Sequence, residues 1–516
     1  MSADRTVTGK TADDTLAPLR SRTGYALIAA TVLASGVASY DAYVVNVAVP
    51  AIAGHFDAGV TAIQWTLTSY LLSVAALLLL AGALADRYGR RRVLTVGLAV
   101  MLVASVLCAT ATSIEWLVAA RVAQGVGAAL VTPVSLALLN GTLRTSDRAR
   151  GIGVWAGLST LATTVGPYLG GWLVDHTSWR WVFLLNLPLI AGALAALRAV
   201  PETGGGRRSL SLDAVGALLG VLGLGGVIYA LTEAGGSGWS SAPVVVALAV
   251  GVGCLVALVP TERRRRAPML RLSLFASRQF DAINVVTILL YGALAAAGYL
   301  FVIEAELKLG YSASQAGAAL IPQSLVFLTL SLFGGSLVAR IGPRWLMVAG
   351  IVLVAVSQVW LAQVQPGSSY LGTILPAALL RGLGLGLTVT PLTAAVLAAV
   401  GDADLGEASA INDAAARVGA VVAVAVVPVL IGVGASSTLA DSLTDGYQPA
   451  MLVIGAFCAV AALVAGVFVS DQRTAVPRIA PPPPFHGCAL PVTRRPASSV
   501  AQLPGQVGAP GGTTSP

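Results

Sequence analysis

The sequence has few charged residues for its length. Only 10% of its 516 residues are Asp, Glu, Lys or Arg, whereas 56% are hydrophobic, and the mean hydropathy is +0.83. A water-soluble protein of this length does not need such an apolar composition. Apolar stretches of about 20 residues recur along the whole chain, and each is long enough to cross the ~30 Å hydrocarbon core of a bilayer. The sequence therefore predicts an all-α polytopic membrane protein.

Cysteine and histidine are scarce, which argues against several kinds of site. The four cysteines are scattered without metal-ligand spacing, and none of the three histidines lies near an acidic intramembrane cluster. Gly9-Lys10-Thr11 resembles the end of a phosphate-binding loop, but the glycine required five residues earlier is absent and no strand precedes it. We therefore expect no metal site, no nucleotide or other cofactor, and no enzymatic activity.

Lysine is almost absent, since two lysines accompany 29 arginines. Together with the many Ala, Val and Gly residues, this usage suggests a GC-rich bacterial source by association. The net charge of +8 is better explained by membrane topology than by affinity for nucleic acid. We expect the lipid bilayer, protons and a small substrate as partners, with no nucleic acid and no required protein partner.

Fourteen apolar segments are separated by short polar or Gly/Pro-rich stretches. We predict membrane-spanning helices over residues 23–48, 61–82, 93–112, 116–139, 151–174, 181–199, 212–232, 242–260, 280–303, 314–338, 344–364, 371–396, 409–434 and 450–469.

The arginines predict the orientation in the cell (plasma) membrane. If the N-terminus is cytoplasmic, nearly every basic cluster lies on the cytoplasmic side, and only Arg180 and Lys308 fall in outward loops. Both termini are then cytoplasmic. Residues 1–22 form a polar tail that leads directly into a full-length span, so no cleavable signal peptide is expected. Residues 471–516 are rich in Pro, Gly, Ser and Thr and predict a disordered cytoplasmic tail.

An internal repeat divides the spans into two halves. Thr132-Pro133 and Thr390-Pro391 open similar hexapeptides, and the segment 335–344 echoes the segment 82–91. This repeat predicts an N-terminal six-helix bundle over 23–199, two additional central spans with linkers over 200–279, and a C-terminal six-helix bundle over 280–470.

A short polar loop lies between the second and third predicted spans. It reads Gly82-Ala-Leu-Ala-Asp86-Arg87-Tyr-Gly89-Arg90-Arg-Arg. The glycines favour a tight turn and close helix approach. The arginines alone would also fit a positively charged anchor on the cytoplasmic face.

Two ionisable residues lie inside predicted spans. An ionised carboxylate at Asp41 costs about 2.5 kcal/mol or more at the bilayer centre, so it should face a partner or water, or carry a proton. Arg121 cannot lose its proton and needs an anionic partner. Both lie at comparable depth, which makes a contact between them a hypothesis. Alternatively, Asp41 is solvated near the outer interface and Arg121 snorkels to it.

The fifth span carries a glycine and proline pattern, Gly157-x8-Gly166-Pro167-x2-Gly170-Gly171. Proline removes a backbone hydrogen bond and bends a helix, while glycine lets a neighbouring helix approach. An ordinary packing kink is the simpler interpretation, although kinks seldom carry this whole pattern.

These motifs resemble those of the major facilitator superfamily, and in particular its drug:proton antiporters with fourteen spans. The loop at 82–92, Tyr40-Asp41-x2-Val-Val-Asn46, Arg121-x2-Gln124-Gly125 and the Gly166-Pro167 segment all carry the resemblance. It implies two bundles rocking around a midplane cavity. It further implies an inner gate at Gly82, Asp86, Arg87, Gly89 and Arg90, proton coupling at Asp41 and Arg121, and an antiporter motif at Gly157, Gly166, Pro167, Gly170 and Gly171.

Aromatic and amide side chains suit an amphipathic substrate, although each could instead face lipid or pack. Glu304 and Glu306 depart from the family's pattern; they form either an interfacial pair near Lys308 or a site for a cationic substrate or second proton. The candidate cavity residues are Tyr43, Asn46, Trp65, Tyr70, Tyr168, Tyr291, Glu304, Glu306, Gln323 and Phe327. Arg381 also lies within a span, and no partner for it is evident.

The resemblance predicts a proton-coupled efflux transporter that exports amphipathic drugs or antibiotics, as in the self-resistance of an antibiotic producer. The alternatives are a proton-coupled transporter of an endogenous metabolite and an uptake symporter. A membrane-embedded enzyme would need a polar catalytic cluster, and a membrane sensor would need a soluble signalling domain; neither is evident in the sequence.

Overall fold

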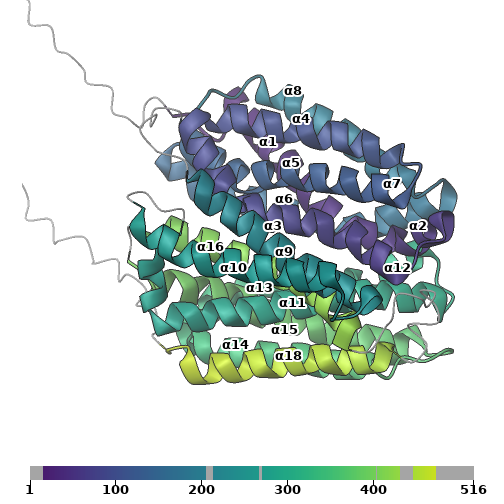
Figure 1. Ribbon diagram of the computed structural model, residues 1–516. Helices are drawn as coiled ribbons and strands as arrows, with labels where there is room; N and C mark the ends of the chain where they lie inside the picture. The colour runs from purple at the N-terminus through teal and green to yellow at the C-terminus, as the bar shows by residue number, and fades with distance from the viewer. Residues whose placement is uncertain (1–15, 205–212, 266–269, 402–403, 431–445, 472–516) are drawn as a thin grey trace, which may run out of the picture. The chain divides into compact units, whose positions relative to one another are not determined.

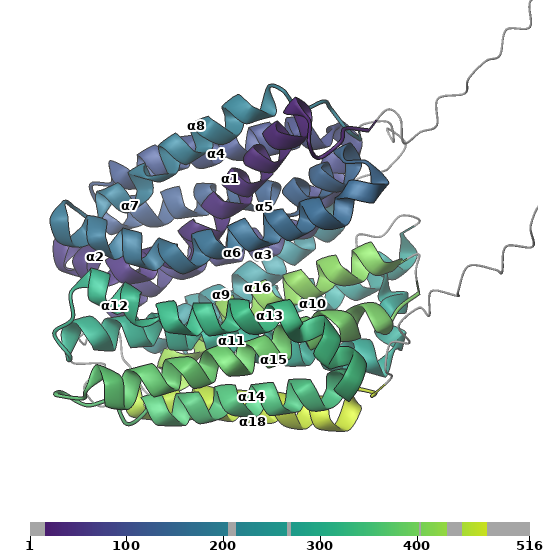
Figure 2. The same ribbon diagram turned by 180° about the vertical axis from the view of Figure 1, so that it is seen from behind.

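The computed structural model describes residues 16–204, 213–265, 270–401, 404–430 and 446–471. These residues are almost entirely helical; they contain one isolated β-bridge, between Ala17 and Leu143. The described helices lie side by side in one compact unit (Figures 1 and 2). Helices suit the hydrocarbon environment because every backbone N–H and C=O group is hydrogen-bonded within its own segment.

The first bundle is formed by the N-terminal helices. In chain order they are α1 (Arg22–Val44), the 3₁₀ turn η2 (Val45–Ala48), α2 (Val49–Phe56), α3 (Val60–Tyr88), α4 (Arg90–Ala109), α5 (Ile114–Thr142), α6 (Thr145–His176), α7 (Arg180–Leu184) and α8 (Asn186–Leu197). A buried apolar cluster joins α1, α3, α4, α5 and α8 in the interior of this bundle.

The second bundle is formed by the C-terminal helices. They are η3 (Leu272–Ala276), α11 (Arg278–Leu307), α12 (Ala313–Ala319), α13 (Ile321–Ile341), α14 (Pro343–Leu361), the π turn η4 (Tyr370–Ile374), α15 (Leu375–Ala398), α16 (Leu405–Leu430) and α18 (Tyr447–Phe468). Its core also reaches the first bundle, because η2 and α2 share buried contacts with α11.

Two further helices separate the bundles in the sequence, α9 (Ala214–Ser237) and α10 (Ala242–Arg264). α9 packs against α3 and α16, so one helix contacts both bundles. The Trp65 indole nitrogen on α3 donates a 2.8 Å hydrogen bond to Glu233 on α9. α10 packs mainly on α9 and is only 11% buried over its most apolar stretch, which leaves most of it to face lipid.

Proline lies at two breaks inside the expected spans and at a third position just beyond the span 23–48. Pro50, Pro322 and Pro376 lie at the first or second residue of α2, α13 and α15. Proline is accommodated there because the first turn of a helix has no intrahelical partner for its N–H groups. The segments 314–338 and 371–396 are therefore each built from two helical pieces rather than one. The segment 23–48 is divided between α1 and η2, before Pro50.

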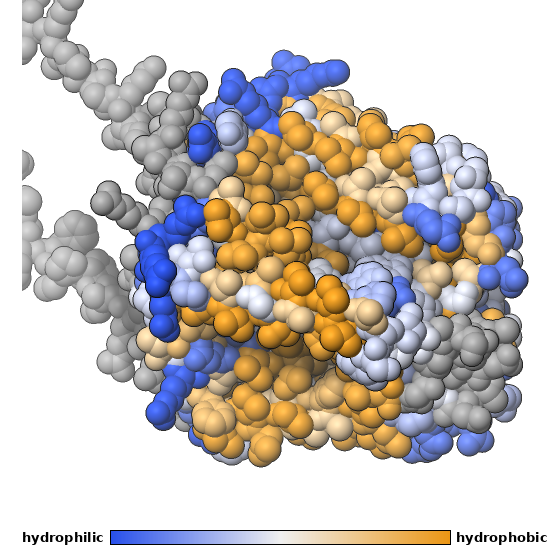
Figure 3. All heavy atoms as spheres, viewed as in Figure 1, coloured by the Kyte–Doolittle hydropathy of each residue, from blue (hydrophilic) through white to orange (hydrophobic). Residues whose placement is uncertain are grey.

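Thirteen helical segments among the described residues are long and apolar enough to cross a membrane. They coincide with all the expected spans except 151–174. That segment lies in α6, a helix of 32 residues whose Gly, Ser and Thr residues lower its hydropathy. Apolar side chains cover the middle of the helices, and hydrophilic ones gather toward both ends (Figure 3). The all-helical membrane fold is confirmed, while the count of fourteen spans and the placement of the termini stay predictions.

Candidate functional site

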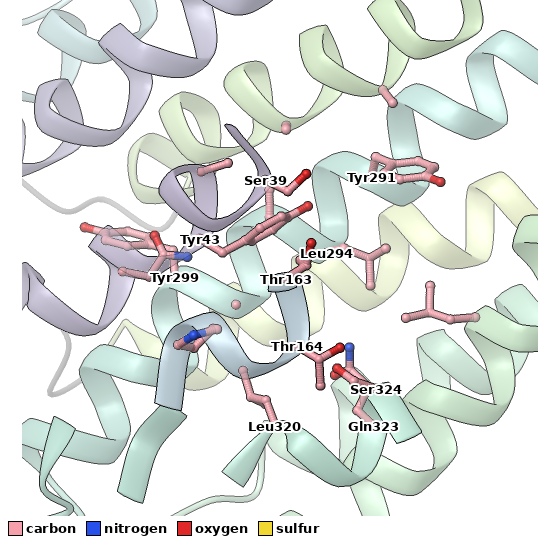
Figure 4. Close-up of a pocket in the computed structure, with 18 of the residues that line it drawn as sticks. Ser39, Tyr43, Thr163, Thr164, Tyr291, Leu294, Tyr299, Leu320, Gln323 and Ser324 are labelled. Atoms are coloured by element: carbon pink, nitrogen blue, oxygen red, sulfur yellow. The ribbon is translucent and has the colours of Figure 1, made fainter. Parts of the chain in front are cut away.

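A cavity of about 420 Å³ lies between the two bundles. Its wall combines polar side chains of the first bundle with aromatic and charged side chains of the second. Ser39, Tyr43, Thr163 and Thr164 come from α1 and α6, whereas Tyr291, Tyr299 and Gln323 come from α11 and α13 (Figure 4). This volume lies within the range of pockets that bind drug-sized molecules.

Half of the predicted cavity residues line this cavity. They are Tyr43, Asn46, Tyr291, Gln323 and Phe327. The lining residues Ser39, Ala42 and Tyr43 of α1 and Asn46 of η2 follow helical spacing, so one face of this continuous helical segment is exposed to the cavity.

The other five predicted residues lie elsewhere. Trp65 bonds to Glu233 of α9, and the Tyr70 hydroxyl donates to the Ala38 carbonyl within the first bundle. Tyr168 is 39% exposed but lies outside the cavity lining. Residue type alone did not determine these positions, because each helix presents aromatic side chains to several different neighbours.

Glu304 and Glu306 also lie outside the cavity lining. Glu304 is buried and its carboxylate is 3.2 Å from the Lys308 ammonium group. Glu304 therefore pairs with Lys308, as in the first of the two sequence interpretations, an interfacial acidic pair near Lys308. Oε1 of Glu306 is buried without a hydrogen-bond partner among the described residues.

Asp41 and Arg121 meet in the interior of the first bundle, so the hypothesised contact is present. Nη1 of Arg121 is 2.5 Å from Oδ2 of Asp41, and the two side chains are 1% and 0% exposed. The other carboxylate oxygen accepts hydrogen bonds of 2.9 Å from Gln124 and from Asn186. Three helices, α1, α5 and α8, therefore hold one fully desolvated ion pair, which excludes a solvated Asp41 and a snorkelling Arg121 in this conformation.

Further groups complete the environment of the guanidinium. Nε of Arg121 donates to the Thr66 carbonyl at 3.2 Å, and Nη1 also donates to Gln124 at 2.8 Å. The guanidinium lies over the Tyr70 ring, 4.2 Å from its centre. Buried ion pairs persist where such additional bonds satisfy the remaining donors and acceptors. Sequence reasoning included Gln124 in a family pattern without assigning it this role.

The ion pair lies directly behind the cavity wall. Ala42 and Tyr43 line the cavity, whereas Asp41 points into the bundle from the opposite face of α1. A change in the Asp41 network therefore acts on the same two turns of helix that form part of the cavity wall.

The α6 glycines bring this helix against its neighbours. A Cβ atom at Gly166 would lie 2.8 Å from the Tyr40 ring, and one at Gly170 would lie 2.1 Å from the Val44 side chain. A Cβ at Gly171 would be 2.3 Å from the Ala313 carbonyl oxygen on α12. No described residue has an atom within 4 Å of such an atom at Gly157, so this glycine makes no close contact with the described helices.

The end of the bundles that carries α2 and α12 joins the two halves, and we call it the α12 end. Here the Asp175 carboxylate of α6 accepts hydrogen bonds from the backbone N–H groups of Ala313 and Ser314, at 3.0 and 2.9 Å. Gly317 of α12 also approaches the Pro167 carbonyl closely. Sequence reasoning did not identify Asp175, because it reads as an ordinary acidic residue at a helix end.

The predicted gate loop lies at the opposite end. Gly89 has a φ of 102°, a conformation that favours glycine, and it connects α3 to α4. Asp86 and Arg90 form an ion pair at 3.2 Å, and Arg90 also donates to the Ala137 carbonyl of α5. No atom of residues 16–204, 213–265, 270–401, 404–430 or 446–471 lies within 4 Å of a Cβ placed at Gly82, so the expected close approach is absent among these residues.

Glu202 is a further member of this loop that sequence reasoning missed. Its carboxylate accepts hydrogen bonds from the backbone N–H groups of Arg91 and Arg92, at 2.8 and 3.1 Å, at the start of α4. A negative charge there is favourable because the N-terminus of a helix carries partial positive charge.

Arg87, another predicted gate residue, lies beside an aromatic ring. Its guanidinium is 5.4 Å from the centre of the Tyr88 ring.

The cavity wall contains three charged residues that were not among the predicted site residues. Arg381 lies on α15, and Asp413 and Arg417 lie one turn apart on α16 with 3.8 Å between their charged groups. Nε of Arg381 donates to Oε1 of Gln323 at 2.5 Å. The available signal was the presence of ionisable residues within apolar segments, which is a general mark of functional positions in membranes.

Comparisons with known proteins agree with this architecture. The family model described as Major Facilitator Superfamily matches residues 31–276 and 283–503. Multidrug resistance protein Stp of Mycobacterium tuberculosis is 35% identical over 80% of this chain and 78% of its own. Methylenomycin A resistance protein of Bacillus subtilis is 32% identical over 88% of this chain and 96% of its own. The crystal structure of the POT family transporter PepTSo has a TM-score of 0.63 at 15% identity, covering 86% and 97% of the two chains.

Proposed function

Because this chain belongs to the major facilitator superfamily, we propose that it is a proton-coupled antiporter that exports amphipathic drugs or antibiotics across the cell membrane. Relatives named for multidrug and antibiotic resistance, matched over most of the chain, support drug efflux. Proton coupling is inferred from the family and from one observation, the desolvated Asp41–Arg121 pair beside the cavity. Self-resistance in an antibiotic producer is the corresponding biological role.

The proposed mechanism begins with a proton on Asp41. Protonation removes the negative charge that holds the Arg121 guanidinium, so the bonds to Gln124 and Asn186 rearrange. Since Ala42 and Tyr43 are the next residues of α1, this rearrangement reaches the cavity wall. The two bundles then separate at the α12 end and close at the end that carries the loop around Gly89, as alternating access requires.

The proton gradient supplies the free energy for this cycle. One charge moving through about 150 mV provides about 3.5 kcal/mol, which supports a substrate gradient of roughly 300-fold. We assign the protein no cofactor, no nucleotide requirement and no enzymatic activity, and we expect only the bilayer, protons and substrate as partners.

Efflux in a transporter-deficient strain tests this function. Cells producing the wild-type protein should retain less of a fluorescent amphipathic dye than cells without it, and an uncoupler should abolish the difference. Asp41→Asn should abolish uphill efflux because the side chain no longer takes up a proton. Asp57→Asn is a matched control, since Asp57 is exposed and has a left-handed backbone conformation that asparagine tolerates.

The outcomes separate the alternatives. Dye accumulation above the level of the empty strain would favour an uptake symporter. Uphill efflux at the full wild-type rate by Asp41→Asn would contradict the proposed role of Asp41. Efflux that persists with an uncoupler would exclude proton coupling.

A further inference from the structure

The guanidinium of Arg381 is the least satisfied charged group in the cavity wall. Its residue is only 2% exposed, and Nε donates to Gln323. Nη1 is buried and has no hydrogen-bond partner among the described residues. Since Arg381 lines the cavity, a partner for this donor can come from the cavity itself.

No carboxylate among the described residues lies close enough to neutralise Arg381. Arg381 forms no ion pair within 4.0 Å with a described residue. Asp413 is paired with Arg417, and Glu304 is paired with Lys308. The described cavity wall thus carries two arginines against one aspartate. A buried charge without a partner is costly by several kcal/mol, so an anion entering the cavity would offset a penalty that the empty protein carries.

The rest of the wall suits an apolar molecular body. The rings of Tyr43, Tyr291, Tyr299 and Phe327 line the cavity, and Figure 4 shows the first three on the wall formed by α1 and α11. Arg381 and Gln323 supply a polar pole on α15 and α13. A ligand that matches both features has an aromatic or aliphatic body and one anionic end.

We propose that the cavity binds amphipathic organic anions, with a carboxylate accepting a hydrogen bond from Nη1 of Arg381. This assignment rests on the proposed efflux function and names its substrate class. It differs from a cationic-substrate site at Glu304 and Glu306, because neither of these residues lines the cavity. Arginine suits this role because its planar group presents several donors to a carboxylate.

Binding of three matched probes to the purified full-length protein tests the proposal. The probes share one aminocoumarin body and carry a carboxylate, a carboxamide or a primary amine. The wild-type protein should bind the carboxylate about tenfold more tightly than the carboxamide, since a charge-assisted hydrogen bond is about twice as strong as a neutral one. The amine should bind most weakly.

Variants identify the residue responsible. Arg381→Met should remove the preference for the carboxylate while changing carboxamide affinity less than about twofold. Arg381→Lys should retain part of the preference. Arg264→Met is the control, because Arg264 is an exposed residue near the end of α10 and its loss changes the net charge equally. Melting temperatures of all variants check that the protein remains folded.

Each outcome decides the matter. Equal affinity for the three probes, binding of none, or a carboxylate preference that survives in Arg381→Met would overturn the proposal. The uncoupler-sensitive dye efflux described above is measured separately. A protein that exports dye but ignores the carboxylate would refute the substrate class alone, and one that exports nothing would refute the efflux function.

Discussion

At the scale of single residues, the protein places its polar side chains in two different settings. Asp41 is enclosed by Arg121, Gln124 and Asn186, so almost every hydrogen-bonding group near it has a partner. Arg381, by contrast, lines a cavity and has one donor, Nη1, without a partner in the described part of the chain. The proposals above assign proton coupling to the first setting and ligand binding to the second.

The Asp41–Arg121 pair should be important for stability. Arg121→Met leaves a buried carboxylate without its cation, so the free energy of unfolding should fall by about 3–5 kcal/mol. The thermal unfolding midpoint in detergent measures this effect. Adding Asp41→Asn to the same chain should recover part of the loss, because the uncompensated charge is gone.

Arg92→Met provides the comparison for that experiment. The Arg92 side chain is 81% exposed and 4.0 Å from Glu202, so its removal should change stability by less than about 1 kcal/mol. Equal unfolding midpoints for Arg121→Met and Arg92→Met would show that the buried ion pair contributes no more to stability than the exposed one.

At the scale of secondary structure, α6 has a central position. Its glycines allow contact with α1 at Gly166 and Gly170 and with α12 at Gly171, so one helix touches both bundles. α9 has a comparable position on the other side, between α3 and α16. Both helices therefore connect the two bundles.

The α6–α12 contact should be intolerant of a larger side chain. Gly171→Val places atoms against the Ala313 backbone, which overpacks the closed α12 end by about 1–3 kcal/mol. Dye efflux should therefore fall by about tenfold while the protein stays folded. Gly157→Val is the matched control because open space surrounds that position, and a similar loss in both variants would point to a general effect of valine in α6.

The hydrogen bond between α3 and α9 should stabilise the two additional helices. Trp65→Phe removes the indole donor to Glu233 and should lower the free energy of unfolding by about 1 kcal/mol. Trp239→Phe, at a tryptophan that is 51% exposed, should have a smaller effect on the unfolding midpoint. A larger fall in the unfolding midpoint for Trp239→Phe than for Trp65→Phe would show that the Trp65–Glu233 hydrogen bond does not stabilise the packing of α9.

At the scale of the whole transporter, the described contacts join the bundles at the α12 end. Asp175 bridges the first bundle to the start of α12, and the Asp86–Arg90 pair at the opposite end lies within the first bundle. Closure at the α12 end leaves the other end as the place where the cavity would open in this conformation.

Asp175→Asn should shift the balance toward opening at the α12 end. The neutral amide is a weaker partner for the α12 N-terminus, because the carboxylate charge is favourable there by about 0.3–1 kcal/mol. Spin labels at Gly54→Cys and Leu307→Cys, in a chain whose native cysteines are replaced by alanine, should report a larger share of long distances. Glu115→Gln, an exposed acid at the start of α5, should leave the distribution unchanged.

The sequence by itself determined the membrane class, the helical segments and the family. The length of an apolar segment identifies a span because a helix must be long enough to cross the hydrocarbon core of the bilayer. Motifs such as Gly166-Pro167 are recognisable because their residues lie close together in the sequence. Asp41 and Arg121 were recognisable as candidates because a charged side chain within the membrane is costly and therefore marks a functional position. The contact between them could only be a hypothesis, since it depends on how two distant helices are rotated.

Only the tertiary structure decided which side chains share a space. Whether Tyr70 or Tyr291 faces the cavity depends on the rotation of its helix, and aromatic residues are apolar enough for either environment. The contacts of Asp175 with α12, and of Arg381 with Gln323, join residues that are 58 or more positions apart. No local pattern encodes such pairings, because packing between helices sets them.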